Sequence, residues 1–488
     1  LFDNPNLPHL AQWFTALLEP DGSSFVPFSN CGRGTSDAGT ILRQLAREYR
    51  DGHAQWFADR MAERREGTDV FGFLWCDPSL EPVAPADLPR ATLFRSVDWA
   101  MLRSAWGDPQ AVLFALKGGQ RDWDHQHHDT NHFVLYAYGR PLIVDLLYPH
   151  NIWGCQTEAH NTIMVNGKNQ RGRVHVAGNR GHPDHRGVIS ELVEAPWYAR
   201  LVGDASLAYE QEEVKSFVRE VMYLRKASAA DPPDYFVLFD DLDATTPAQL
   251  DWLLHSYGQM AVEGSRITIS QDDAAVDVTL VAPERFTSQI TAKNLEDAGS
   301  EKPFESAQAI RWIAVRPAEP VQRGHFLSVL VPRKLSTPAA AVAVTSLRES
   351  NLVGAAVTSG ATRDVAAFAL DEPKIAAEGI TAVGRSCFVR RSQGKVLAAA
   401  LHNGQVISAD GLLLFEIDSS GNAALRFDDE VVEATLDLYD STMVRLHSPR
   451  PPAKVLVNGA EHSFTYDDQA RCVRVDSGRV RDLRILFQ

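Results

Sequence analysis

The chain has 488 residues, more than one compact core holds, so two or three domains are predicted. Apolar residues make up 44% and charged residues 23%, which excludes a largely disordered chain. The formal net charge of −15 argues against nucleic acid or a membrane surface as a general partner, and no apolar run reaches the roughly 18 residues that a membrane-spanning helix needs.

The first part of the chain, residues 1–91, is predicted to be a helical segment. Apolar residues keep a helical spacing from Leu7 to Leu18 and again within Ser36–Glu66. A glycine- and serine-rich stretch, Asp21–Gly39, lies between the two patterns. Because the chain begins without a methionine or a signal-like stretch, we expect a processed or truncated product.

Over residues 92–334 the apolar pattern changes to a period of two, which predicts a large antiparallel β-sandwich. Pro332–Ala341 is the expected joint to a smaller C-terminal β domain, residues 335–488, where turn signals such as Asn403-Gly404 recur. The expected fold class is therefore mostly β. The expected strands of the sandwich include Trp99–Ser104, Ala111–Leu116, Phe133–Tyr138, Leu142–Leu147, Thr162–Val165, Phe217–Leu224 and Tyr235–Phe239.

Histidines are concentrated in one part of the chain, since nine of the sixteen fall between His125 and His185. On an extended strand, His125 and His127 would share one face. A chain reversal near residues 138–141 would bring Asp145 back beside His127, and His160 would open the next strand. Two histidines and one carboxylate are a usual donor set for zinc, so His127, Asp145 and His160 are the predicted ligands.

Two other readings of the histidine pair must be weighed. An isolated His-x-His on a strand is more often a hydrogen-bonded pair than a metal site. Cupin-like sites also use this pair, but they expect a glutamate four residues after the second histidine. Asn131 occupies that position here, which disfavours a cupin.

Basic and aromatic residues close to these histidines could bind an anionic ligand. The candidates are Arg140, Lys168, Arg171 and Arg173, which would attract an anionic polymer to an otherwise acidic protein. Such a run can equally be a solvated face. Trp153 could stack on the apolar face of a sugar ring or could belong to the core, and both readings stay open.

The same region resembles the heparinase II/III-like polysaccharide lyases, which include heparin, chondroitin and alginate lyases. The resemblance implies the last helices of an (α/α) toroid, then a large antiparallel β-sandwich, then a small β domain. It rests on an ordered series of motifs: His125-Gln126-His127-His128-Asp129-Thr130-Asn131-His132-Phe133, Tyr138-Gly139, Ile143-Val144-Asp145, Tyr148, Ala159-His160-Asn161-Thr162, Val165-Asn166-Gly167 and Gln170.

Carried over by position, the resemblance implies a mainly structural zinc ion held by His127, Asp145 and His160. It implies that His125 faces substrate and that Tyr148 supplies an aromatic hydroxyl near the same cleft. In this family the principal catalytic tyrosine and a group that neutralises the substrate carboxylate come from the toroid, so both are expected upstream of the first residue.

The implied function is a bacterial, secreted or periplasmic polysaccharide lyase. It would cleave uronate-containing glycans of the alginate or glycosaminoglycan type by β-elimination. Its partner would be an acidic polysaccharide or oligosaccharide, and the interpretation leaves room for a homodimer. Two alternatives remain, a zinc-braced carbohydrate-binding protein without catalysis and a metal-dependent hydrolase or oxygenase.

Overall fold

The protein is described by a computed structural model that covers most of the chain. Among the described residues, no helix combines the length and the apolar character needed to cross a membrane. The described residues are 2–32, 34, 38–63, 70–119, 125–147, 149, 151–172, 186–228, 231–304, 306–337, 341–438, 443–476 and 480–487.

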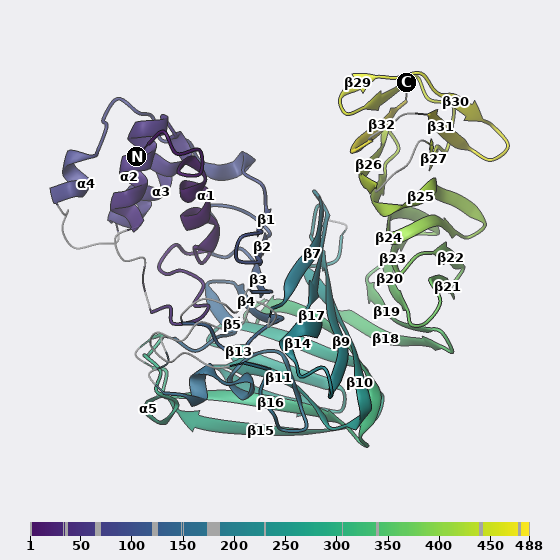
Figure 1. The fold of residues 1–488 in the computed structure, drawn as a ribbon. Coiled ribbons are helices and arrows are strands. Elements are labelled where there is room, and N and C mark those ends of the chain that lie inside the picture. Colours follow the sequence, from purple (N-terminus) through teal and green to yellow (C-terminus); the bar gives the residue numbers. More distant parts are fainter. Residues whose placement is uncertain are drawn as a thin grey trace.

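Four helices occupy the N-terminal end, as the apolar spacing predicts. They are α1 (Pro8–Leu17), α2 (Ala38–Tyr49), α3 (Gly52–Glu63) and the short α4 (Val70–Leu74). Helices α2 and α3 pack against each other through a small apolar cluster that includes buried Leu42. The helices form a separate group beside the sheets (Figure 1).

Three antiparallel sheets follow and make up the predicted sandwich. The first sheet has the order β1 (Ala91–Phe94), β2 (Trp99–Arg103), β3 (Leu113–Lys117), β4 (His132–Ala137) and β5 (Arg140–Ile143). The second has the order β12 (Gln259–Glu263), β13 (Arg266–Gln271), β14 (Ala274–Ala282), β17 (Val321–Lys334), β10 (Tyr235–Ala248), β9 (Val214–Leu224), β8 (Tyr198–Asp204) and β7 (Val188–Ala195). The third has the order β15 (Phe286–Asn294), β16 (Ala309–Pro317), β11 (Leu250–Ser256) and β6 (Ile163–Val165), with helix α5 (Leu295–Ala298) following β15.

The main core lies between the second sheet and the other two. Alternate residues of each strand point into it, because successive side chains on a strand face opposite sides. Phe114 of β3 stacks on Phe133 of β4 at 5.2 Å and on Phe236 of β10 at 5.0 Å between ring centroids. Trp252 of β11 is buried in the same core. The mostly β sandwich is therefore confirmed.

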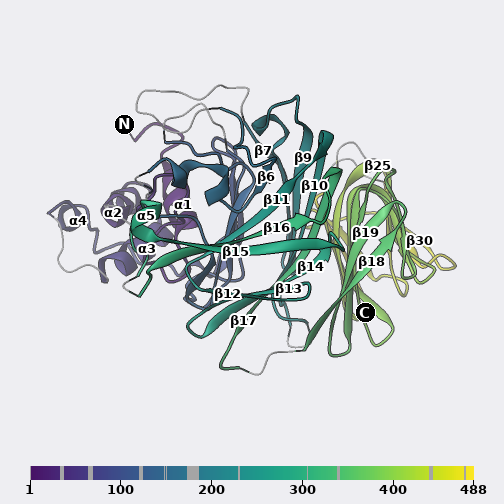
Figure 2. The same ribbon diagram turned by 90° about the horizontal axis from the view of Figure 1, so that it is seen from below.

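The outer faces of the sandwich are covered as well. Met101 and Val134 of the first sheet pack on Phe28, which follows the first helix. On the other side, Phe239 of the second sheet stacks on Phe368 of the C-terminal sheet at 4.5 Å. The sandwich consequently lies between the helices and the C-terminal strands (Figure 2).

The C-terminal strands form one further antiparallel sheet, consistent with a second β segment after the sandwich. A buried ion pair joins the two segments, since Arg390 contacts Asp231 at 3.0 Å and Asp364 at 2.7 Å. The strands are β18 (Val342–Glu349), β19 (Leu352–Ser359), β20 (Thr362–Ala369), β21 (Lys374–Ala377), β22 (Ile380–Val383), β23 (Ser386–Ser392), β24 (Lys395–Ala409), β25 (Leu412–Phe427), β26 (Val431–Leu438), β27 (Met443–His447), β28 (Lys454–Val457), β29 (Ala460–Glu461), β30 (Thr465–Asp467), β31 (Cys472–Asp476) and β32 (Asp482–Leu486).

Candidate metal centre

The histidine-rich motif begins in a loop and enters strand β4 only at His132. His125 and Asn131 have positive φ angles of 63° and 61°, so the backbone turns at both ends of this loop. The expectation that His125 and His127 share one face of an extended strand is therefore wrong. The turn leaves His125 exposed, whereas His127 is buried.

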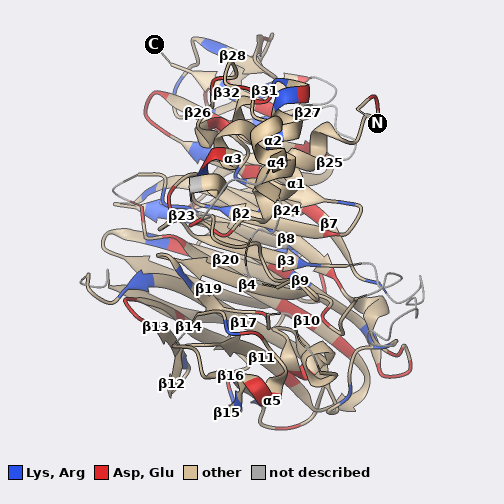
Figure 3. Cartoon of the chain, turned by 90° about the vertical axis from the view of Figure 1, so that its left-hand side faces the viewer, with Lys and Arg blue, Asp and Glu red and all other residues tan. Residues whose placement is uncertain are grey.

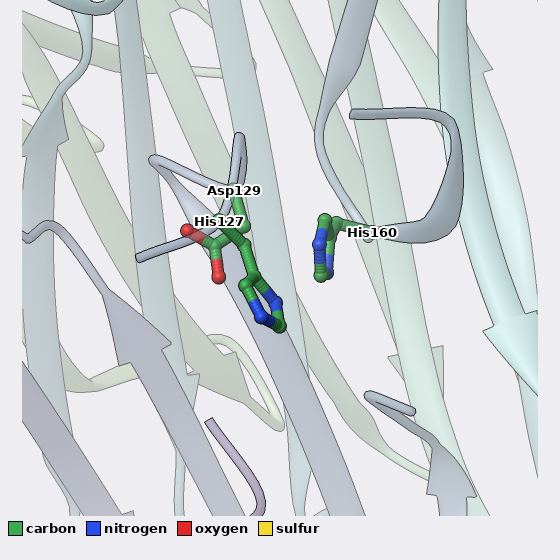
Figure 4. Close-up of side chains that lie close together, drawn as sticks. All are labelled: His127, Asp129 and His160. Atoms are coloured by element: carbon green, nitrogen blue, oxygen red, sulfur yellow. The ribbon is translucent and has the colours of Figure 1, made fainter. Parts of the chain in front are cut away.

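Five side chains of the types that can bind a metal ion converge at this loop. They are His127, Asp129, His132, Asp145 and His160, and each is at most 2% exposed. Their donor atoms form two overlapping sets, in each of which all atoms lie within 4.8 Å of one another. One set is His127, Asp129 and His160, which approach from two separate segments (Figure 4). The other is His132, Asp145 and His160.

The three predicted ligands are divided between these sets. His160 belongs to both, His127 to the first and Asp145 to the second. The His160 and His127 rings lie 5.3 Å apart, and His160 Nδ1 donates to Asp145 Oδ1 at 3.0 Å. Asp129 and His132 were not predicted as ligands, although both belong to the quoted motif.

Several polar atoms in this cluster are buried without a hydrogen-bond partner in the described part of the chain. They are His127 Nδ1, His132 Nε2, His160 Nε2 and Asp145 Oδ2. His132 Nε2 and Asp145 Oδ2 lie 3.4 Å apart without forming a hydrogen bond. Buried polar atoms are rarely left unpaired, and a bound ion is one physical explanation. Imidazole nitrogens and carboxylate oxygens are donors that suit Zn²⁺.

The charges inside the cluster are balanced by neighbouring groups. Burial opposes ionisation of Asp129, but Lys117 at 2.5 Å, together with His160 and His127, holds the pKa of that carboxyl well below its usual value. Burial likewise opposes ionisation of Asp145, yet His132 and His160 lower its pKa well below the usual range. Burial and the nearby His160 lower the pKa of His127 to about 3, so the ring stays neutral, the form that binds metals.

Asn161 fixes the geometry on one side of the cluster. Its side-chain amide donates to the carbonyls of Phe133 at 2.7 Å and Val144 at 2.9 Å. Its Oδ1 accepts from the backbone N–H of His255 at 2.7 Å, and its own backbone N–H donates to His132 Nδ1 at 2.8 Å. One residue thus ties strands of the first and third sheets to the cluster.

Arg219 and Gly203 support the loop on its other side. Arg219 donates to the backbone carbonyls of Asn131 and Asn161, and Asp240 binds its guanidinium at 2.6 and 2.8 Å. Asn131 Nδ2 donates to the Gly203 carbonyl at 2.9 Å. A Cβ at Gly203 would lie 2.2 Å from Asn131 Oδ1, so only glycine leaves room for this contact.

Asn30 connects the helical segment to the two histidines of the predicted pair. Its Nδ2 lies 3.1 Å from His125 Nδ1, and its Oδ1 lies 2.7 Å from His127 Nε2. The preceding Ser29 accepts a hydrogen bond from Lys117 at 2.7 Å. Sequence reasoning missed Asn30, because it lies 95 residues before His125 and belongs to no motif that marks it.

Three of the four predicted glycan-binding cations lie within the described residues, and each is paired with a carboxylate. Arg140 contacts Asp272 at 2.7 Å, Lys168 contacts Glu213, and Arg171 lies 3.4 Å from Glu210. Each of these cations therefore has a neighbour of opposite charge, in keeping with Figure 3, where basic and acidic segments are interspersed over the described chain. A glycan anion would therefore have to share these cations with carboxylates.

Trp153 is half-buried and lies at the edge of a small apolar cluster. Its ring contacts Trp312 at 5.4 Å, Lys293 lies over it at 4.7 Å, and its Nε1 donates to Glu158 at 3.0 Å. These contacts place it between the core and solvent. The other two predicted residues, Tyr148 and Arg173, lie outside the described residues.

Comparison with known proteins extends this picture. Residues 86–319 match the family described as Heparinase II/III-like, C-terminal. Heparinase III is similar in structure, with 14% identity and a TM-score of 0.54 over 75% of this chain and 54% of that one. A heparan sulfate lyase HepC mutant from Pedobacter heparinus gives 13% identity and a TM-score of 0.53 over 73% and 51%.

At these identities the similar structures establish the fold alone. The chain spans about half the length of the solved structures it matches, since it covers 54% of the heparinase III chain and 51% of the heparan sulfate lyase chain. Among curated protein sequences, none matches this chain.

Proposed function

We propose that this protein acts as a polysaccharide lyase, because residues 86–319 match the heparinase II/III-like C-terminal family. Its substrate would be a uronate-containing glycan of the alginate or glycosaminoglycan type, cleaved by β-elimination. The observation that carries the proposal is the exposed His125, held by Asn30 beside a fully buried histidine and aspartate cluster. We also propose a secreted or periplasmic location, because a polymeric glycan does not cross the inner membrane of a bacterium intact.

The proposed metal is Zn²⁺, and the ligands we propose are His127, Asp145 and His160. The donor types fit, and each of the three residues carries a buried polar atom that lacks a partner within the described residues. When bound, zinc would supply a positive charge that ties together the loop before β4, the segment after β5 and the turn before β6. Asp129 and His132 are the other donors within reach.

The burial of the cluster supports a bracing role for the metal. All five candidate donors are at most 2% exposed, so a polymeric substrate has no direct route to an ion among them. A metal-dependent hydrolase or oxygenase needs an open coordination position that substrate or water can reach. The exposed His125 beside the cluster is better placed to meet a glycan.

The chemistry of β-elimination defines what the protein's residues must do. A hydrogen bond to the uronate carboxylate acidifies the proton at C5, and we assign this role to His125. A base then takes the C5 proton, the C4–O4 bond breaks as the C4–C5 double bond forms, and the departing oxygen receives a proton. For proton transfer we propose Tyr148, which the family resemblance singles out and which lies outside the described residues.

The test is to incubate the full-length protein, including any residues that precede Leu1, with alginate, hyaluronan, chondroitin and heparin. A lyase should release products whose new C4–C5 double bond, conjugated with the carboxylate, absorbs in the ultraviolet, and mass spectrometry should show no added water. Absence of unsaturated product from every uronate polymer would overturn the proposal.

A zinc-braced carbohydrate-binding protein without catalysis is the second candidate. The buried cluster favours it as well, because an enclosed ion can serve architecture alone. It predicts measurable binding of uronate glycans by calorimetry together with no unsaturated product. The same polymers therefore separate the two candidates.

A further inference from the structure

The segment that carries Asn30 is held firmly against the first sheet. The Val26 N–H donates to the Leu17 carbonyl at 2.8 Å, which ties the segment to the end of helix α1. The Phe28 ring packs edge-on against His132 at 5.6 Å and against Trp99 at 5.2 Å between centroids. The Asn30 amide therefore reaches the two histidines from a supported backbone.

The two ends of this amide have opposite hydrogen-bonding character. An amide oxygen only accepts, so His127 must donate to it through a proton on Nε2. An amide nitrogen only donates, so His125 must accept from it through the lone pair on Nδ1. The opposite orientation would place the His127 proton on Nδ1, which is buried and has no acceptor among the described residues.

We propose that Asn30 is a positioning residue that selects the ring nitrogen each of these histidines presents. With its proton on Nε2, His127 directs the Nδ1 lone pair into the buried cluster, where the donor set fits a metal ion. With its lone pair on Nδ1 engaged, His125 carries its proton on Nε2. One side chain from the helical segment thus sets the tautomer of His127 in the cluster and of the neighbouring exposed His125.

The arrangement has a consequence for chemistry that rests on the proposed lyase function. A His125 ring with its proton on Nε2 can donate a hydrogen bond to the uronate carboxylate. The same ring cannot take the C5 proton through Nε2 without first losing its bond from Asn30. His125 is therefore a carboxylate-binding group, and proton abstraction belongs to another residue.

The first test replaces the amide by an isosteric apolar group, Asn30→Leu. Zinc affinity, measured by competition with a chelator, should fall by about 10- to 100-fold, the usual effect of removing a group that orients a ligand. Ring-nitrogen NMR of histidine-labelled protein should show the His127 proton no longer confined to Nε2. Unchanged zinc affinity with an unchanged His127 tautomer would overturn the proposal.

A matched control is Asn351→Leu in the C-terminal sheet. The Asn351 amide also uses both ends, donating to the Glu372 carbonyl at 2.8 Å and accepting from the Asp371 N–H at 2.8 Å. This variant should leave zinc affinity and the His127 tautomer as they are. An equal loss of zinc in the control would show that the effect is general destabilisation and would count against Asn30.

The second variant, Asn30→Asp, separates the two roles and remains informative if Asn30→Leu does not fold. A carboxylate still accepts from His127 Nε2, so zinc affinity should stay near that of the parent protein. The new carboxylate cannot donate to His125, so the His125 proton should move to Nδ1. The kcat for the proposed substrate should then fall with little change in KM. An unchanged His125 tautomer would contradict the proposal. Zinc binding and the histidine tautomers are measured without glycan. Failure of the Asn30 proposal can therefore be distinguished from failure of the proposed lyase function.

Discussion

His160 donates from Nδ1 to Asp145 Oδ1 over 3.0 Å, and both side chains are almost completely buried. A carboxylate accepts only, so this bond places the imidazole proton on Nδ1 and leaves Nε2 as a lone pair. That Nε2 has no partner within the described part of the chain. Carboxylate and imidazole together form the arrangement by which proteins orient a metal-binding histidine.

His160→Ala should abolish stoichiometric zinc binding and lower the melting temperature. His160 is shared by both donor sets, so its loss leaves neither set complete. Metal analysis of purified protein and calorimetry with and without a chelator provide the measurement. His462→Ala, which removes only a bond to the Ser463 carbonyl, is the control. Retention of one zinc per chain in His160→Ala would contradict the assignment.

His127→Ala should lose zinc, whereas His132→Ala should keep it. His127 donates from Nε2 to Asn30 and keeps a lone pair on Nδ1 that is unpaired within the described residues. His132 Nδ1 instead accepts from the Asn161 N–H at 2.8 Å, which puts the His132 proton on Nε2 and leaves that ring no free lone pair for a metal. His132→Ala should still lower stability, because the ring packs against Phe28. Zinc content measured on both variants decides the matter, and the reverse result would transfer the site to His132, Asp145 and His160.

His125→Gln should leave zinc content and melting temperature nearly unchanged but reduce turnover of the proposed substrate. The side chain is exposed and lies outside both donor sets, so little packing is lost. Rates from the ultraviolet assay, compared with metal content of the same preparation, provide the measurement. Loss of zinc equal to that of His127→Ala would refute the separation of the two histidines.

Lys117→Met should destabilise the metal-free protein by about 3–5 kcal/mol, because it leaves Asp129 as an uncompensated buried charge. The two side chains are only 1% and 3% exposed. The double variant Lys117→Met with Asp129→Leu should recover part of the loss. Urea unfolding in the presence of chelator measures both. The exposed pair of Lys374 and Glu372 is the control, and its removal should change stability little.

Arg390→Met should be far more damaging than Arg391→Met one residue later. Arg390 is buried between Asp231 and Asp364, so its removal should cost about 3–5 kcal/mol and loosen the C-terminal sheet from the sandwich. Arg391 pairs with the half-exposed Asp410 and should cost about 1 kcal/mol or less. Urea unfolding with limited proteolysis checks the difference, and equal effects would contradict the inferred joint.

Gly203→Ala should destabilise the protein by about 1–3 kcal/mol through overpacking. The new Cβ would lie 2.2 Å from Asn131 Oδ1, which must move and give up its support for the loop before His132. Zinc affinity should fall with it. Gly32→Ala, whose Cβ would meet its nearest neighbour at 3.4 Å, is the milder comparison. Equal stability of the two variants would contradict the role of this contact.

The sequence alone determined the class of fold because the relevant signals are local. Short apolar runs bounded by turn residues predict strands without knowledge of their partners, as for the expected strand Ala111–Leu116, which the structure shows as β3 (Leu113–Lys117). The same holds for the helical spacing of α2 and α3. The predicted ligands were recognisable as well, because histidine and carboxylate donors stand in an ordered series from His127 to His160.

Only the tertiary structure decided how these donors meet. The left-handed backbone at His125 breaks the strand that the His-x-His pattern favours, and it separates an exposed ring from the buried His127. Asn30 approaches from a distant segment, and His160 belongs to both donor sets, which only the fold brings together. Which nitrogen each ring presents depends on hydrogen bonds between segments far apart in sequence, and no local pattern encodes such contacts.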